Sequence, residues 1–562
     1  MTNSIEEFGD AACIFAIGTN TTSDHPVIGL QVKQAVKNGG KLIVADPRHI
    51  DLCDFADIWL QQKPGTDVAL LMGMMKVIVD EGLMDQDFID NRCENFDEFK
   101  ASLAEFELNK VSEITGVPAD DIADAARMYA GNSPASILYC MGITQHTHGT
   151  DNVMGIANLA MLTGNIGKDS SGVNPLRGQN NVQGACDMGA LPNVYTGYQQ
   201  VADESAQKKF EKSWGAALSP EPGLVLTEMF HAMGEGHLKA VYLMGENPVL
   251  SDPDANHIRE ALEKLDFLVV QDIFLTETAQ YADVVLPAAS FAEKEGTFSN
   301  TERRVQRVRK VLEPVGDSKA DWEITCEIAQ KMSAKGFDFA TAQDIFTEIA
   351  KVTPSYAGIT FERLDIEGGL QWPCPNSDHP GTKYLHKGNF VRGKGNFVAL
   401  SYRPSDEQPD SEYPLILTTG RSPYHYHTGT MTRKAKGLNM LGPEELVWIH
   451  PQDAQSLGIV DGEMVRVTSR RGSVEAKSKV TAESQQGVVF MTFHFAEASA
   501  NILTNPATDP VAKTPEFKVC AVKVENTSEP VSDAAEASIE ESTPVEASPA
   551  AEPPTEPEAA AA

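Results

Sequence analysis

Short apolar runs alternate with helical patterns in the first third of the chain, and this alternation restricts the possible fold more than any other feature. Residues 12–17 and 41–45 are apolar runs of strand length, and residues 27–37 between them have helical periodicity. Strand, helix and strand in this order predict a parallel sheet covered by helices. The same order returns over residues 239–270, which predicts a second parallel sheet.

Glycines and polar residues follow the strands of both expected sheets. They stand at residues 18–20, 46–48 and 142–145 in the first unit, and at residues 245–247 and 271–272 in the second. Parallel sheets of this kind bind ligands at the carboxyl ends of their strands. Two similar units with similar polar segments therefore predict two copies of one kind of ligand.

The pattern changes twice towards the C-terminus. Residues 358–405 are irregular and rich in Gly and Pro, and short apolar runs with tight turns follow from residue 413. Such closely spaced runs predict a small antiparallel barrel. After residue 524 the chain consists mainly of Ala, Pro, Glu and Ser, and we expect residues 526–562 to be a disordered acidic tail because they cannot bury enough apolar surface to fold.

Composition excludes several classes of function. The chain of 562 residues has a net charge of −34, and residues 525–562 contribute ten acidic and no basic residues to it. The body is still strongly acidic without them, so we expect no nucleic-acid partner, because phosphate contacts need clustered Lys and Arg. No run of eighteen apolar residues occurs, which predicts no direct membrane insertion. The first residues do not resemble an export signal, and we expect a cytoplasmic location, with an export signal upstream of this sequence as the alternative.

Eight cysteines are scattered through the chain, and no two of them have Cys-x-x-Cys spacing. This spacing argues against an iron–sulfur cluster or a Cys-rich zinc site formed by these residues. Two pairs of histidines, His146 with His148 and His425 with His427, lack a third ligand at the spacing of a structural zinc site. We therefore expect no metal ligands among the side chains of this chain.

Residues 172–189 place one arginine, Arg177, among glycines and carboxamide side chains. Glycines let the backbone approach a ligand closely, and carboxamides offer hydrogen bonds without charge. The planar guanidinium of Arg177 matches a carboxylate with two parallel hydrogen bonds and does not lose its proton. The run therefore predicts a binding site for a small anion beside a polar cofactor, with an Asn- and Gly-rich surface loop as the alternative.

This run resembles the substrate-pocket segment of molybdopterin-dependent formate dehydrogenases, catalytic subunit, within the dimethyl-sulfoxide-reductase family. Seven other segments resemble that family in the same order: residues 18–26, 44–48, 141–145, 162–165, 244–248, 270–274 and 420–429. The resemblance extends from about residue 5 to about residue 525.

The resemblance implies an α/β fold with two doubly wound parallel-sheet domains and a C-terminal double-psi-like β-barrel. The implied domains are residues 1–178, the first dinucleotide-binding domain; 179–400, the second, with an irregular insert; 401–525, the barrel; and 526–562, the tail. The implied cofactor is molybdenum, or tungsten, held between two molybdopterin guanine dinucleotides. The implied reaction is oxidation of formate to carbon dioxide, in which Arg177 orients the substrate.

Candidates for cofactor binding combine a position after a strand with the resemblance. Asp46 and Asp272 follow strands, where an Asp commonly accepts from a ribose or a base, whereas Asp321 rests on the resemblance alone. Arg48 can contact phosphate. The full set of expected cofactor-binding residues is Gly18, Asn20, His25, Asp46, Arg48, Gly65, Asp67, Met141, Gly142, Gln145, Gly178, Gln179, Gly245, Asn247, Gln271, Asp272, Asp321, Arg421, His425, His427 and Lys518.

The chain departs from the family pattern at its start. Upstream of the matching segment, family members carry a cysteine-rich [4Fe–4S] domain, the first strands of the second α/β unit, and a Cys or selenocysteine that ligates the metal. We expect a fragment of a selenoprotein whose in-frame UGA codon was read as a stop, or a chain completed by a second one. A sheet that lacks strands exposes an edge and an apolar face, so the chain alone is expected to aggregate and to be inactive.

Other functions share parts of this pattern. A nitrate or sulfoxide reductase keeps the cofactor but is not expected to keep Arg177 within its run, and a non-catalytic gene fragment or electron-transfer scaffold is expected to lose the site residues. The resemblance implies formate as substrate, an iron–sulfur electron-transfer subunit, an NAD or hydrogenase module, and a role in anaerobic metabolism. The choice between molybdenum and tungsten, the electron acceptor and the oligomeric state stay open.

Overall fold

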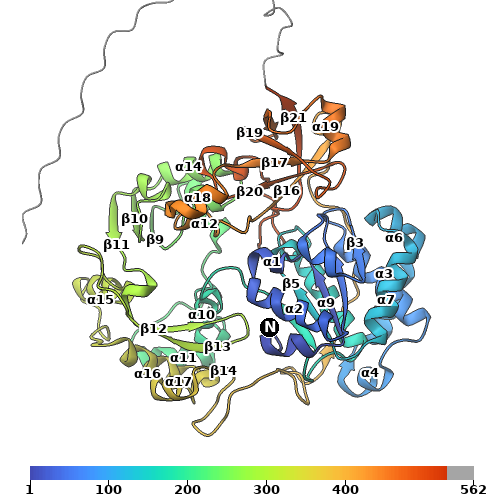
Figure 1. Cartoon of the computed structure of the whole chain (residues 1–562). Helices are drawn as coiled ribbons and strands as arrows, with labels where there is room; N and C mark the ends of the chain where they lie inside the picture. Colours follow the sequence, from blue (N-terminus) through green and yellow to red (C-terminus); the bar gives the residue numbers. More distant parts are fainter. Residues whose placement is uncertain (528–562) are drawn as a thin grey trace, which may run out of the picture.

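The computed structural model describes residues 1–527. Figure 1 shows the first α/β unit on the right, the second on the left and a β-barrel above them. Apart from Asn526 and Thr527, the expected acidic tail lies outside the described residues. No helix among residues 1–527 is both long and apolar enough to cross a membrane.

Five parallel strands form the sheet of the first unit. In the order in which they pair, they are β3 (Ile58–Leu60), β2 (Lys41–Ala45), β1 (Cys13–Ile17), β5 (Ala135–Tyr139) and β6 (Gly172–Pro175). The chain proceeds outwards from β1 to β3 and then returns past β1 to β5. Strand order therefore reverses between β1 and β5, and the predicted parallel sheet is confirmed.

Helices cover both faces of this sheet. They are α2 (Pro26–Lys37) on one face, and α3 (Asp67–Asp80), α7 (Ala119–Gly131) and α9 (Gly149–Leu162) on the other. Successive side chains of a strand point to opposite faces. Phe15 and Ile17 accordingly pack in the core with α3, α7 and α9, whereas Ile14 and Ala16 pack with Val32 of α2. The doubly wound arrangement is thus confirmed for the first unit.

Shorter elements complete the first unit. They are α1 (Thr21–Asp24), α4 (Gln86–Arg92), β4 (Cys93–Glu94), α5 (Phe96–Ser102), α6 (Leu108–Thr115) and α8 (Met141–Thr144). β4 pairs with β15 (Gly395–Asn396), which comes from the far end of the second unit. This pairing ties the irregular segment before the barrel to the first unit.

Three parallel strands form the sheet of the second unit. They are β9 (Ala240–Met244), β10 (Phe267–Asp272) and β11 (Val284–Pro287), with β10 in the centre. Helices α12 (Leu226–Gly234) and α14 (Ala255–Glu263) cover one face of this sheet. Leu243, Leu268 and Val270 are buried beneath these helices. The predicted second parallel sheet is confirmed.

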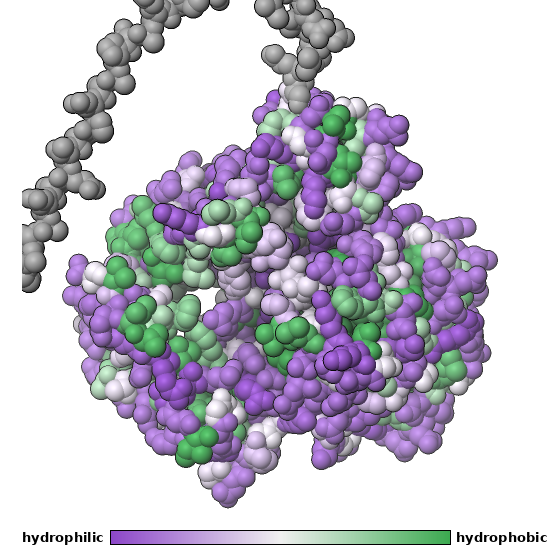
Figure 2. All heavy atoms as spheres, viewed as in Figure 1, coloured by the Kyte–Doolittle hydropathy of each residue, from purple (hydrophilic) through white to green (hydrophobic). Residues whose placement is uncertain are grey.

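The opposite face of the second sheet is apolar and exposed. Strand register places Tyr242 opposite Val269, and Val269 opposite Val284, on this face. Tyr242, Met244 and Phe267 are 42%, 45% and 45% exposed. Figure 2 shows hydrophobic residues gathered on the surface over the second unit. The exposed apolar face expected of a sheet that lacks strands is therefore present.

A small antiparallel sheet occupies the lower part of the second unit, and only its last strand falls within residues 358–405, which the sequence predicted to be irregular. It consists of β12 (Gly296–Ser299), β13 (Arg304–Val308) and β14 (Leu370–Gln371), packed against α16 (Ala342–Val352) and α17 (Phe361–Glu367). The remaining elements of this unit are α10 (Val182–Asp187), β7 (Val194–Tyr195), β8 (Gln199–Gln200), α11 (Glu204–Trp214), α13 (Pro248–Ser251) and α15 (Asp321–Lys331).

The C-terminal strands close into a six-stranded barrel. Around it they are β16 (Leu415–Gly420), β20 (Val488–Thr492), β17 (Leu446–Ile449), β19 (Ser473–Val480), β18 (Met464–Thr468) and β21 (Cys520–Asn526), accompanied by α18 (Lys436–Leu441) and α19 (Pro451–Leu457). The predicted barrel is confirmed, but the antiparallel prediction is wrong in part. β16 pairs with β20 and β17 with β19 in parallel, because long connections return the chain to a neighbouring strand in the same direction.

We expect the exposed face of the second sheet to drive self-association of the isolated chain. The double variant Met244→Lys/Val284→Lys introduces two charges on this face and loses little buried surface, because both residues are already more than a third exposed. Light scattering at increasing concentration should show a later onset of aggregation. A control, Val391→Lys/Val511→Lys, alters side chains that are 98% and 72% exposed elsewhere. An equal effect of both double variants would contradict the role of this exposed face in self-association.

Candidate functional site

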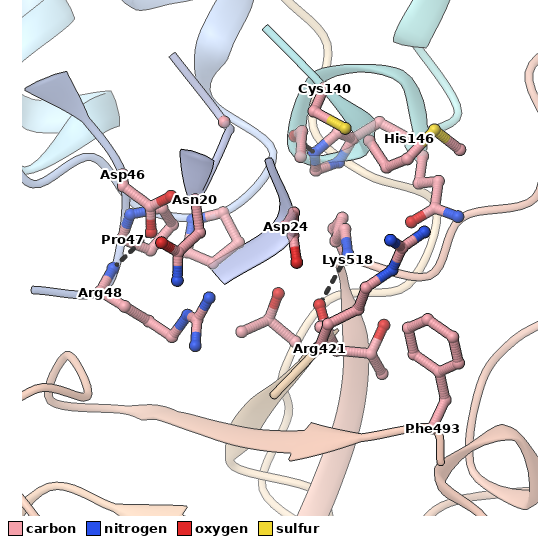
Figure 3. Close-up of a pocket in the computed structure, with 18 of the residues that line it drawn as sticks. Asn20, Asp24, Asp46, Pro47, Arg48, Cys140, His146, Arg421, Phe493 and Lys518 are labelled. Atoms are coloured by element: carbon pink, nitrogen blue, oxygen red, sulfur yellow. Dashed lines mark hydrogen bonds between the residues drawn. The ribbon is translucent and has the colours of Figure 1, made fainter. Parts of the chain in front are cut away.

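A cavity lies between the carboxyl edge of the first sheet and the barrel. The loops after β1, β2, β3 and β5 supply one wall, and the ends of β16 and β20 with the segment before β21 supply the other. Figure 3 shows side chains from both walls around the same space. The cavity thus lies where strand order reverses, which is where sheets of this kind bind ligands.

Twelve residues that the sequence singled out line this cavity. They are Gly18, Asn20, Asp46, Arg48, Asp67, Met141, Gly142, Gln145, Gln179, Arg421, His427 and Lys518. Folding brings them together from opposite ends of the chain. Their binding of a cofactor stays a prediction.

Three cations face the cavity without a carboxylate partner. Arg48, Arg421 and Lys518 form no ion pair with the described residues. The guanidinium of Arg48 lies 3.8 Å from the ring centroid of Phe490, and the ammonium of Lys518 donates to the carbonyl of Thr419 at 2.6 Å. Burial and the charge of Arg48 lower the pKa of Lys518 to about 8. Unpaired cations this close together favour an anionic ligand.

Carboxyl and imidazole groups in the cavity wall have shifted pKa values because they are buried. Burial raises the pKa of Asp67 to about 7, and Gln62 donates to its Oδ1 at 3.1 Å. Burial lowers the pKa of His146 to about 3, so the ring is neutral at physiological pH. Burial also raises the pKa of Asp46, whose Oδ1 accepts the backbone N–H of Arg48 at 2.9 Å. The cavity therefore offers hydrogen-bond donors and acceptors beside its three cations.

Arg177 lies beside the cavity, in the loop after β6. Its backbone N–H donates to Oγ1 of Thr301 at 3.0 Å, its carbonyl lies 2.7 Å from Nε2 of His25, and its Nε donates to Oε1 of Gln183 at 3.3 Å. Its two terminal amino groups make no hydrogen bond with residues 1–527. They remain free for an anion that accepts two hydrogen bonds, and Gln179 places the same loop in the cavity wall.

Three predicted glycines allow segments of the site to approach one another. A Cβ on Gly142 would lie 2.6 Å from the carbonyl oxygen of Gly18, and a Cβ on Gly178 would lie 2.4 Å from Nη2 of Arg421. A Cβ on Gly65 would lie 2.5 Å from Oγ of Ser405, and Gly65 has a φ of +80°. A side chain at Gly142 would separate the loops after β1 and β5, and side chains at Gly65 or Gly178 would press on Ser405 or Arg421.

Two family models match this chain. One, described as molybdopterin oxidoreductase, matches residues 1–331, and the other, described as molydopterin dinucleotide binding domain, matches residues 415–521. The first match alone covers more than half of the chain. The chain belongs to the molybdopterin oxidoreductase family.

The names of the relatives of this molybdopterin oxidoreductase point to different substrates. The F420-dependent formate dehydrogenase 1 subunit alpha of Methanococcus maripaludis is 53% identical over 528 residues, covering 93% of this chain and 78% of the relative. The assimilatory nitrate reductase catalytic subunit of Bacillus subtilis is 38% identical over 538 residues, covering 93% and 76%. The structure of acetylene hydratase from Pelobacter acetylenicus has a TM-score of 0.75 at 22% identity, covering 93% and 78%, which shows a shared fold alone.

The chemistry of the cavity fits the dinucleotide cofactor of a molybdopterin oxidoreductase. Arg48, Arg421 and Lys518 would hold its phosphates, since no described carboxylate pairs with them. Buried polar atoms such as Oδ1 of Asn20 and Oε1 of Gln62 have no partner among the described residues, and a ribose or guanine would supply one. No group of three or more His, Cys, Asp or Glu side chains within residues 1–527 is placed to hold a metal ion.

Five predicted residues lie together at the carboxyl edge of the second sheet, away from this cavity. They are Gly245, Asn247, Gln271, Asp272 and Asp321. Nε2 of Gln271 donates to Oδ1 of Asp321 at 2.7 Å, and Lys294 forms an ion pair with Asp321. Burial raises the pKa of Asp272. These residues stand at the same edge of the second sheet as the cavity residues do in the first. A second ligand site at this edge stays a prediction.

His425 lies in the loop after β16 and does not line the cavity. Its Nε2 lies 2.6 Å from the carbonyl oxygen of Gly442, and its Nδ1 lies 3.3 Å from Oγ1 of Thr432. Both ring nitrogens therefore contact this chain. His427, two residues on, is the histidine of this segment that faces the cavity, and burial lowers its pKa to about 4.

Several cavity residues were missed by the sequence analysis. They are Asp24, Pro47, Gln62, Pro64, Cys140, His146, Thr418, Thr419, Gly420 and Phe493. A signal existed for some of them: Gln62 and Phe493 follow β3 and β20 just as Asp46 follows β2. The rule that ligands meet the carboxyl ends of strands would have found these two residues if it had been applied to every strand.

We expect Lys518→Met to stabilise the ligand-free chain below pH 8. The pKa of Lys518 is lowered from 10.5 to about 8 in the folded state, so the cost of holding its charge is fully present below pH 8 and disappears as pH rises towards 10.5. The gain in free energy of unfolding is at most about 3 kcal/mol. Urea unfolding at pH 7.5 and pH 10 should show a difference between variant and wild type that shrinks at the higher pH. A pH-independent difference would contradict the buried charge.

Proposed function

We propose that this chain is the catalytic portion of a formate dehydrogenase that oxidises formate to carbon dioxide at a molybdenum or tungsten bis-molybdopterin guanine dinucleotide centre. The observation that carries the proposal is Arg177, whose terminal amino groups are free of hydrogen bonds to residues 1–527 beside a cation-lined cavity. When bound, the metal–pterin centre supplies the acceptor for the two electrons that formate loses. The 53% identity to a formate dehydrogenase alpha subunit supports the choice of substrate.

Arg177 binds and orients the substrate in this proposal. Its guanidinium matches both oxygens of a carboxylate, and the C–H bond of formate points away from those oxygens, hence away from the arginine. Because the guanidinium keeps its proton, it compensates the charge of formate without neutralising it by proton transfer. His25 and Thr301 hold the backbone of Arg177 from both sides, which limits the orientations of the bound anion.

The cofactor would be held at both sheets. Arg48, Arg421 and Lys518 would hold the phosphates of one dinucleotide, and Asp46 would accept from its ribose or base. Asp272, at the carboxyl edge of the second sheet, would hold the second dinucleotide. This assignment is supported by the matching position of the two aspartates after β2 and at the end of β10.

Electrons leave the chain through partner subunits in this proposal. The relative from Methanococcus maripaludis is named a subunit alpha, which supports an assembly with other chains. An iron–sulfur electron-transfer subunit, a [4Fe–4S] cluster on an upstream segment, and an NAD or hydrogenase module are the expected additions. A cytoplasmic location also stays a prediction.

Nitrate reduction is the second candidate, because a 38% identical relative is a nitrate reductase catalytic subunit. Nitrate is also a planar anion and could accept two hydrogen bonds from Arg177. The higher identity to the formate dehydrogenase over the same share of this chain favours formate. Cofactor-loaded protein should therefore reduce a viologen dye with formate and should not reduce nitrate at a comparable kcat/KM.

We expect Arg177→Lys to lower kcat/KM for formate by roughly 100-fold, because a single ammonium keeps the charge but loses the two parallel hydrogen bonds. Formate-dependent dye reduction by cofactor-loaded protein, normalised to bound metal, measures this loss. Arg127→Lys is the matched control, since Arg127 lies on the surface and pairs with Glu81 and Asp124. An unchanged kcat/KM in Arg177→Lys would show that Arg177 does not orient the substrate.

A further inference from the structure

Asp187, the last residue of α10, is a buried carboxylate that no basic side chain neutralises directly. It is 1% exposed and forms no ion pair with residues 1–527. Four neutral groups donate to it instead: Nε2 of Gln183 and the hydroxyl of Tyr198 at 2.8 Å to Oδ1, the hydroxyl of Tyr356 at 2.6 Å and Nε1 of Trp372 at 2.7 Å to Oδ2. Such complete hydrogen bonding compensates the cost of burying a charge.

The two tyrosines act as donors to Asp187. Burial first, and the charge of Asp187 second, raise the pKa of both Tyr198 and Tyr356 above the ordinary value of a phenol. Both hydroxyls therefore keep their protons. Oγ of Ser299 also lies 2.9 Å from the hydroxyl of Tyr356, which fixes that ring. The donors come from separate segments of the second unit, so the position of Asp187 is set by several parts of the fold at once.

Asp187 determines which way the carboxamide of Gln183 faces. Gln183 and Asp187 stand four residues apart on α10, on one side of the helix. Nε2 of Gln183 donates to Oδ1 of Asp187 and, at 3.0 Å, to the hydroxyl of Tyr198. Both donors of the carboxamide are used in this way. Its oxygen must then point in the opposite direction, because a flipped carboxamide would place its oxygen against the carboxylate.

The oxygen of Gln183 points at Arg177. It accepts the Nε–H of Arg177 at 3.3 Å. Among residues 1–527, the guanidinium makes no other hydrogen bond. That bond fixes the plane of the guanidinium and leaves both terminal amino groups for a ligand. A flipped or missing carboxamide would leave the guanidinium free to rotate about its side-chain bonds.

We propose that Asp187 is a positioning residue for the substrate anion, acting through Gln183 on the guanidinium of Arg177. This inference rests on the proposed role of Arg177 in binding the substrate. It extends the site to a buried group that does not line the cavity and does not touch the substrate. The specificity that results is geometric: the pair holds the guanidinium in one plane, which favours a small planar anion over a larger or tetrahedral one.

Two variants test the pathway from Asp187 to Arg177. Asp187→Asn removes the charge and permits a flipped contact with Gln183, and Gln183→Met removes the link while leaving Asp187 three donors. We expect each to raise KM for formate about tenfold with a smaller change in kcat, because Arg177 keeps its charge. The double variant should be no worse than the single ones, since both changes break the same chain of contacts. Additive effects, or an unchanged KM, would overturn the proposal.

Asp509→Asn is the matched control. Asp509 is also 1% exposed and held by neutral donors, among them the N–H and the hydroxyl of Thr150 at 2.8 Å and 2.7 Å. It lies outside the cavity wall and outside the Arg177 contacts. This variant should lower the melting temperature comparably and leave KM for formate unchanged. An equal rise of KM in Asp509→Asn would show that general loss of stability explains the effect and would overturn the proposal.

A second readout separates this inference from the identity of the substrate. In protein labelled with ¹⁵N-arginine, the Nε–H signal of Arg177, assigned with Arg177→Lys, should exchange slowly with water. Asp187→Asn and Gln183→Met should each speed this exchange about tenfold, and Asp509→Asn should not. If formate is not oxidised by the wild type, the proposed function fails while this measurement still tests the positioning. Unchanged exchange in both variants would overturn the inference alone.

Discussion

Arg48, Arg421 and Lys518 surround one cavity, and no described carboxylate is ion-paired with any of them. Like charges held together in a partly buried space destabilise the folded chain, and the lowered pKa of Lys518 is the direct sign of that cost. An anionic ligand that bridges the first unit and the barrel would relieve the repulsion and join the two units. The described residues of this molybdopterin oxidoreductase thus leave the charges of these three side chains uncompensated by ion pairs.

The two α/β units differ in how many faces of their sheets are covered by helices. In the first, every side chain of β1 is buried between helices on both faces. In the second, α12 and α14 bury one face only, and apolar side chains such as Tyr242 and Phe267 on the other are more than 40% exposed. Apolar surface of this kind favours contact with further protein. This unit also carries the residues proposed to hold a second dinucleotide, at the carboxyl edge of the same sheet.

The side chains that hold Arg177, the residue proposed to bind the substrate, are arranged in layers. The guanidinium offers its terminal amino groups, Gln183 holds its Nε, and Asp187 holds Gln183. Each layer is more deeply buried than the one before: Arg177 is exposed, Gln183 is 5% exposed and Asp187 is 1% exposed. A charged side chain that must stay open to a ligand gains its fixed orientation from buried neighbours, which cannot be displaced by water.

Local patterns in the sequence determined the elements and the chemistry of the site. Apolar periodicity predicted β1, α2 and β2, and polar residues after strands predicted the cavity residues at 18–20, 46–48 and 142–145, because both depend on neighbours along the chain. The other predicted cavity residues, such as Arg421 and His427, came from the resemblance to the family. Tertiary structure decided what depends on distant partners: the parallel pairs in the barrel, the position of His425 away from the cavity, and the contact of Asp187 with Tyr356 and Trp372. A buried aspartate at the end of a short helix has no distinguishing local pattern, since its donors stand up to 185 positions away and meet only when the second unit packs.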